Sequence, residues 1–115
     1  MVTVEYAHSD KAHCLQVYGH AMSAPKGEDL VCCAASTLIY TAAQSALWLY
    51  EQGALQQFPG TMLNPGNAQV EAMAIPKAQE SVQQMFRTIA AGFDLLARQY
   101  PEYIVFRETV NGEQA

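Results

Sequence analysis

The feature that most constrains this chain is a stretch of 23 residues, 30–52, that contains neither Gly nor Pro. It is rich in Ala and Leu, residues that favour helix. Asp29 precedes it, and Asp is favoured as an N-cap because its carboxylate accepts hydrogen bonds from the free N–H groups of the first turn. Gly53 follows it, and Gly is favoured just after a helix because it tolerates positive φ. The stretch therefore predicts one long helix with Asp29 as its N-cap.

This predicted helix is apolar on nearly every side. Its main stripe comprises Ala35, Leu38, Ile39, Ala42, Ala46 and Leu49. The other side carries Tyr40, Ala43, Leu47 and Tyr50. A helix of this kind is either central or partly covered by a second subunit, so we expect a homodimer that buries part of the surface around Tyr40, Leu47 and Tyr50. Ser, Thr and Gln side chains interrupt the apolar stretch, and no signal peptide or membrane span is expected.

The rest of the chain predicts strands and a second helix. Alternating apolar residues mark strands near 2–7, 14–18, 60–63, 68–75 and 102–108. Apolar side chains spaced three and four apart mark a helix over 78–99, which Pro101 ends. The order β-β-α-β-β-α-β predicts a single two-layer α+β domain over residues 1–115, in which two main helices pack on a small, mostly antiparallel sheet. The tail from about residue 109 is expected to be disordered.

Charge and cysteine content narrow the classes of function. The net charge is −5, and the six Lys and Arg residues are scattered along the chain. Nucleic acid and anionic membranes both require a basic face, so neither is an expected partner. The three Cys residues are an odd number, and two of them are adjacent. This argues against a disulfide framework and favours a reducing cytoplasm.

The segment GHAMSAPKGEDLVCC places His20 just after a strand and two cysteines where a helix begins. With Asp29 as N-cap, Cys32 would be the third helical residue, where the helix dipole favours a thiolate. A neighbouring imidazole would pair with that thiolate and later protonate a leaving amine. Cys33 lies about 100° further round the helix, so only one of the two thiols can face His20.

Spacing alone leaves three interpretations open. The first is a catalytic Cys and His pair. The second is a small core thiol beside a structural His, which is the commoner case. The third is a metal site built from His20, Cys32, Cys33 and His13, which is weak because adjacent helical cysteines diverge and no C-x₂₋₄-C spacing is present.

The other candidate side chains are expected to carry no chemistry. His8 and His13 flank a predicted turn and are expected to be solvated. Cys14 is expected to be an ordinary strand residue, and Trp48 has the spacing of a packing residue.

The same segment resembles the ribosomal-processing cysteine protease family, Prp. That family carries a GHA triplet, a short loop, and then G-x-D-[IL]-V-C-A followed closely by Ser. The matching residues here are Gly19, His20, Ala21, Gly27, Asp29, Leu30, Val31, Cys32 and Ser36. The His stands twelve residues before the Cys, as in the family. The likeness continues at Gly92 and at the stretch YPEYI, so it covers nearly the whole chain.

The resemblance implies a cofactor-free, metal-free cysteine endopeptidase with a homodimeric α+β fold. His20 would be the general base and acid, and Cys32 the nucleophile. Asp29 would cap the helix or orient His20, and Ser36 would donate a hydrogen bond near the thiolate. The loop that contains Ala21, Met22, Ser23 and Gly27 would close over an extended peptide.

The implied substrate is the N-terminal extension of large-subunit ribosomal protein twenty-seven, whose removal the ribosome needs for maturation. The alternative is a non-catalytic, ribosome-associated binding module with the same fold.

Overall fold

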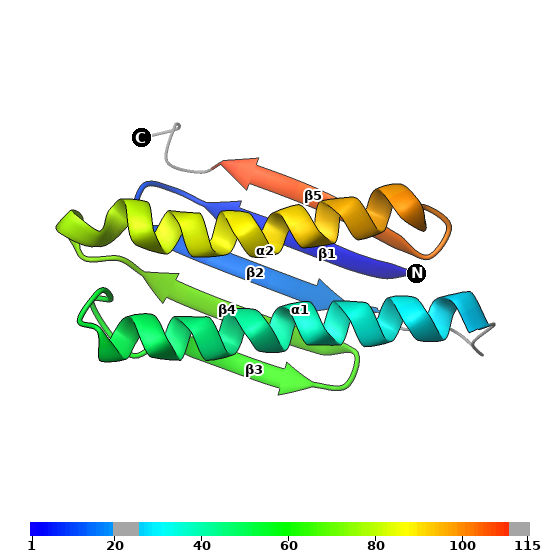
Figure 1. Ribbon diagram of the computed structural model, residues 1–115, viewed down its shortest axis with the longest axis horizontal. Coiled ribbons are helices and arrows are strands. Elements are labelled where there is room, and N and C mark those ends of the chain that lie inside the picture. Colours follow the sequence, from blue (N-terminus) through cyan, green and yellow to red (C-terminus); the bar gives the residue numbers. More distant parts are fainter. Residues whose placement is uncertain (20–25, 111–115) are drawn as a thin grey trace.

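The chain folds into one sheet and two long helices, as its apolar patterns predict (Figure 1). The computed structural model describes residues 1–19 and 26–110, with only the backbone described for 26–29. The elements in chain order are β1 (Val2–His8), β2 (Ala12–Tyr18), α1 (Lys26–Glu51), β3 (Gly60–Asn64), β4 (Asn67–Met73), the 3₁₀ turn η1 (Pro76–Ala78), α2 (Gln79–Gln99) and β5 (Ile104–Val110). The predicted α+β class and element order are confirmed.

The sheet is mixed and mostly antiparallel, with strand order β3-β4-β2-β1-β5. All neighbouring strands run antiparallel except β1 and β5, which are parallel. Both helices lie on the same face of the sheet and run in opposite directions, with α1 over β4 and β3 and α2 over β1 and β2 (Figure 1). The two helices and one sheet face therefore enclose a single core.

The inner sides of α2 and the sheet form most of this core. The predicted stripe on α2 is buried at Val82, Phe86, Ile89 and Phe93, and the sheet contributes Val4, Tyr6, Leu15 and Val70. Gly92 lets the two helices approach closely, because a Cβ there would stand 2.9 Å from Cδ2 of Leu38 on α1. The apolar periodicity of α2 thus fixes which side of it faces the sheet.

The start of α1 corrects the predicted N-cap. The helix begins at Lys26, so Asp29 lies within its first turn and the N-cap prediction is wrong. Cys32 is then the seventh helical residue rather than the third. A Lys-Gly-Glu-Asp run can extend a helix backwards, since nothing in it blocks helical backbone and acidic residues in a first turn interact favourably with the helix dipole.

Only part of the apolar stretch of α1 is buried in the core of the domain. By length and composition alone, residues Leu30–Glu51 could cross a membrane. In the structure, one side of this stretch packs in the shared core through Ala35, Ile39, Ala42, Ala46 and Leu49. Trp48 differs from expectation: it lies on the outer side of α1 and is 57% exposed.

His8 and His13 also differ from expectation, because both are buried, with 6% and 2% of their surface exposed. The strands continue to the turn itself, and the register places His8 opposite His13. His8 lies two residues beyond Tyr6 on β1, and His13 lies opposite His8 on β2, so both face the helices as Tyr6 does. The His13 ring stacks on Phe86 at a centroid distance of 5.0 Å. The Tyr6 hydroxyl and Nδ1 of His13 are hydrogen-bonded at 2.7 Å, and Nε2 of His8 donates to Glu108 at 2.7 Å.

The C-terminal strand is shifted by two residues along the chain, spanning Ile104–Val110 and not 102–108. β5 continues to Val110, so residues 109 and 110 belong to the sheet rather than to a tail. They pair with Ala7 and His8 of β1. The rest of the predicted tail, residues 111–115, lies outside the described residues.

Candidate functional site

A cavity of about 220 Å³ lies between the sheet and the part of α1 from Cys32 to Tyr40. Cys32 and Ser36 line it from the helix, one turn apart. Gly19 lines it at the end of β2. The turn between β3 and β4 forms another part of its wall, with Asn64, Pro65, Gly66 and Asn67. The structure therefore brings two predicted site residues, Cys32 and Ser36, to the wall of one cavity.

Gly19 fixes the path by which the chain leaves β2 toward His20. Its φ of 104° favours glycine, and a Cβ at this position would collide with the carbonyl oxygen of Met1. Its N–H donates to the Gly66 carbonyl at 3.1 Å. The backbone conformation thus requires the Gly of the GHA triplet. Gly19 also lines the cavity at Cys32, so the residue directly before His20 lies at that cavity.

The two adjacent thiols have different surroundings. Cys32 is half-buried, packs against the core and lines the cavity. Cys33 is exposed and does not line it. The rotation of about 100° between neighbouring helical residues produces this difference. Of the two cysteines, Cys32 is the one that a group bound in the cavity would meet.

Several predicted site residues are described only in part or lie outside the described residues. His20, Ala21, Met22 and Ser23 lie outside the described residues. Gly27 and Asp29 have helical backbone in the first turn of α1, without described side chains. The contact between His20 and Cys32 thus remains a prediction.

The position of Cys32 within α1 changes the argument about its ionisation. The unpaired N–H groups of a helix belong to its first four residues, and the effect of the dipole falls off within the first turn. Cys32 lies in the second turn. A thiolate there would depend more on a neighbouring imidazole than on the helix terminus.

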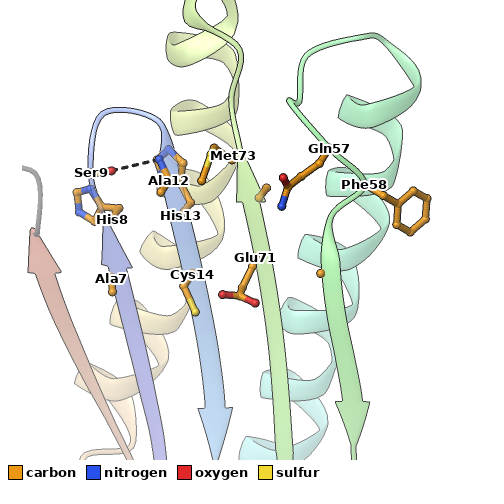
Figure 2. A pocket seen from close by; sticks show the side chains of 12 residues that line it. Ala7, His8, Ser9, Ala12, His13, Cys14, Gln57, Phe58, Glu71 and Met73 are labelled. Atoms are coloured by element: carbon orange, nitrogen blue, oxygen red, sulfur yellow. Dashed lines mark hydrogen bonds between the residues drawn. The ribbon is translucent and has the colours of Figure 1, made fainter.

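A larger cavity, of about 380 Å³, lies at the other end of β2. Figure 2 shows Cys14 and Glu71 on neighbouring strands of its wall, with Gln57 and Phe58 at its far side. Burial and the carboxylates of Glu71 and Glu5 raise the pKa of the Cys14 thiol. Because a nucleophilic cysteine must ionise, these surroundings oppose catalysis, and despite its size this cavity is a poorer candidate site than the one at Cys32.

Within residues 1–19 and 26–110, no group of three or more His, Cys, Asp or Glu side chains is placed to hold a metal.

Sequence reasoning missed other residues of the Cys32 cavity. Tyr40 lines it two turns beyond Cys32, and the Asn-Pro-Gly-Asn turn closes it. The spacing of Cys32, Ser36 and Tyr40 at intervals of four was the signal that could have found the first.

Comparison with known proteins was made for both sequence and fold. The family model for cysteine protease Prp matches residues 1–105. No curated protein matches the sequence. Among solved structures, SMU.848 from Streptococcus mutans is 22% identical, with 96% of each chain covered and a TM-score of 0.72.

Two similar structures are of an essential ribosomal processing protease Prp from S. aureus. The one in complex with a substrate peptide is 18% identical, with a TM-score of 0.71, and the one with a covalently linked product peptide is 19% identical, with a TM-score of 0.68. Each covers 95% of this chain and 100% of that chain.

Proposed function

Because this chain belongs to the Prp family of cysteine proteases, we propose that it is a cysteine endopeptidase with Cys32 as nucleophile and His20 as general base and acid. The observation that carries the proposal is that Gly19, adjacent to His20, and Cys32 line the same cavity. The S. aureus relative was crystallised with a substrate peptide and with a covalently linked product peptide. Both points favour covalent catalysis at this cavity.

The proposed reaction has two steps. His20 takes the proton of the Cys32 thiol, and the thiolate attacks the carbonyl carbon of the scissile peptide bond. The resulting imidazolium gives its proton to the departing amine, which leaves a thioester on Cys32. Water, deprotonated by His20, then hydrolyses the thioester and restores the thiol. No cofactor or metal enters this scheme.

The other predicted site residues support these two. Ser36 lines the cavity one turn from Cys32, and we propose that its hydroxyl donates a hydrogen bond near the thiolate. As Asp29 lies inside the helix, orienting His20 is the role that we propose for it. We propose that the loop with Ala21, Met22 and Ser23 closes over the bound peptide. Gly27 was expected in the same loop, but it lies in the first turn of α1 because the helix begins at Lys26.

The proposed substrate is the N-terminal extension of large-subunit ribosomal protein twenty-seven, cleaved in the cytoplasm during ribosome maturation. Family membership and the ribosomal processing role of the S. aureus relative support it. The alternative is a ribosome-associated binding module without activity. We also propose that the chain forms a homodimer.

The test is cleavage of a synthetic peptide that spans this extension in the same genome, followed by mass spectrometry. We expect Cys32→Ala and His20→Ala to lower the rate by at least about a thousandfold, as loss of a nucleophile or its base does in proteases of this mechanism. Cys33→Ala is the matched control, since the same atoms are removed at an exposed position outside the cavity.

Two results would contradict the assignment. Full activity in Cys32→Ala would remove the nucleophile, and loss of activity in Cys33→Ala alone would move it by one residue. Absence of cleavage by the wild-type protein at any site in the peptide would favour the binding module.

A further inference from the structure

A second cavity, of about 290 Å³, adjoins the one that contains Cys32. It lies between α1 and the edge strand β3 and is lined by Tyr40, Ala43, Gln44, Leu47, Phe58, Pro59, Thr61 and Leu63. Tyr40 lines both cavities. The two cavities lie end to end along one side of α1 with Tyr40 as their shared wall, and together we call them the α1–β3 groove.

Helix geometry explains why this groove begins at Cys32. Residues three and four apart share one side of a helix. Cys32, Ser36, Tyr40, Ala43 and Leu47 follow these intervals, and all five line the groove. From Cys32 to Leu47 the helix rises about 22 Å at 1.5 Å per residue. An extended peptide of about seven residues covers the same distance at about 3.3 Å per residue.

The walls of the groove suit an uncharged, partly apolar peptide. Among the described residues, none of those that line it carries a charge. Tyr40 is 53% exposed and Leu63 is 39% exposed, so both present apolar surface to a ligand. The Phe58 ring is held against Tyr50 in an edge-to-face contact at 5.1 Å, which stiffens the far wall.

The lower wall of the groove favours an extended chain. β3 stands at the end of the strand order, so within the described sheet it pairs with β4 alone. Thr61 and Leu63 pair with Val70 and Ala68, which places their side chains on the helix-covered face of the sheet. The outer edge of such a strand offers backbone N–H and C=O groups at the spacing that an added extended peptide needs.

We propose that the α1–β3 groove binds about seven residues of the substrate on one side of the scissile bond. This assigns Tyr40 and Leu47 to the substrate instead of the homodimer interface that the apolar sides of α1 suggested, so the proposed homodimer uses another face of the protein. One apolar side chain packs against Tyr40, and a second packs at the far end among Leu47, Phe58 and Leu63. This inference rests on the proposed function, because the groove is proposed to bind a peptide whose scissile bond lies at Cys32. Selectivity then comes from residues well removed from the bond that breaks.

The kinetic test compares matched substitutions. Tyr40→Ala should raise KM for the extension peptide about tenfold and leave kcat within about twofold, because it removes binding shared by ground state and transition state. Trp48→Ala is the control, since Trp48 is an equally exposed aromatic residue on the outer side of the same helix. Leu63→Ser should act as Tyr40→Ala does. An unchanged KM in both groove variants would overturn the inference while leaving the proposed protease intact.

A second measurement does not depend on cleavage. Amide hydrogen exchange of Cys32→Ala should slow in β3 and in residues 40–47 when the same peptide is added. Protection there without cleavage by the wild-type protein would support the groove and refute the proposed protease. Cleavage without protection would do the reverse. Protection that rises with protein concentration in the absence of peptide would assign the groove to a second copy and overturn the inference.

Discussion

Replacing His13 by Phe should remove about 2 kcal/mol of the stability that the fold loses between pH 8 and pH 5. His13 is 2% exposed and lies between the Tyr6 hydroxyl, the Phe86 ring and the ring of His8. Burial, the neighbouring His8 and the Arg87 guanidinium lower the pKa of His13 from 6.5 to about 4. The folded protein therefore holds this ring neutral at pH values where the unfolded chain protonates it.

The sign and size follow from this difference in pKa. Between pH 6.5 and about 4 the unfolded chain binds more protons at His13 than the folded chain does, so acid favours unfolding. The contribution of His13 is constant above pH 6.5 and is lost progressively below it. From pH 8 to pH 5, the loss from this one residue is about 2 kcal/mol. The hydrogen bond from Arg87 lowers the pKa of the Glu108 carboxyl from its usual value of 4.5. The stability that Glu108 contributes is therefore lost only below about pH 4.5, outside the range from pH 8 to pH 5.

Urea unfolding at intervals between pH 8 and pH 5 measures the effect. The wild-type protein should lose about 2 kcal/mol more than His13→Phe over that range. The comparison uses the change with pH, so a constant cost from leaving the Tyr6 hydroxyl unpartnered cancels. An NMR titration of the wild-type rings supplies a second measurement that needs no variant. Equal pH dependence in the two proteins, or titration of His13 near pH 6.5, would refute the reasoning.

Two further predictions concern the site and the assembly. Gly19→Ala should destabilise the fold by about 2 kcal/mol, because Ala at positive φ is strained and its Cβ would collide with the Met1 carbonyl; the activity of the folded fraction should fall too, and unchanged urea midpoint and cleavage rate would contradict this. Light scattering at micromolar concentration should give the mass of a homodimer, and a monomer mass would contradict the proposed assembly.

The type and order of the strands and helices could be predicted from local sequence patterns. The alternation at Val2, Val4 and Tyr6 and the intervals of three and four along α2 depend only on the geometry of strand and helix. Each element must bury its apolar side, so the same pattern also fixed the two-layer class. The GHA triplet and the cysteine that follows were equally visible, because a motif is a local property of the chain.

Boundaries and surroundings were decided by the tertiary structure. The start of α1 at Lys26 had no strong local signal, since Asp29 is acceptable both as an N-cap and within a first turn. Likewise, no local rule separates a buried His13 from a solvated one. Its burial follows from pairing with His8 across the hairpin and from the cover that Phe86 of α2 supplies.

The candidate site divides in the same way. The sequence by itself determined which residue types stand twelve apart at the end of a strand and near the start of a helix. Only the packing of α1 above the β3–β4 turn decided that Cys32 lines a cavity and that Cys33 does not. It also placed a second cavity beside the first with Tyr40 as their shared wall, and the opposite wall of this second cavity, β3, lies 20 and more residues further along the chain. Contacts of this kind depend on how α1 and the sheet pack together, which local propensity does not encode.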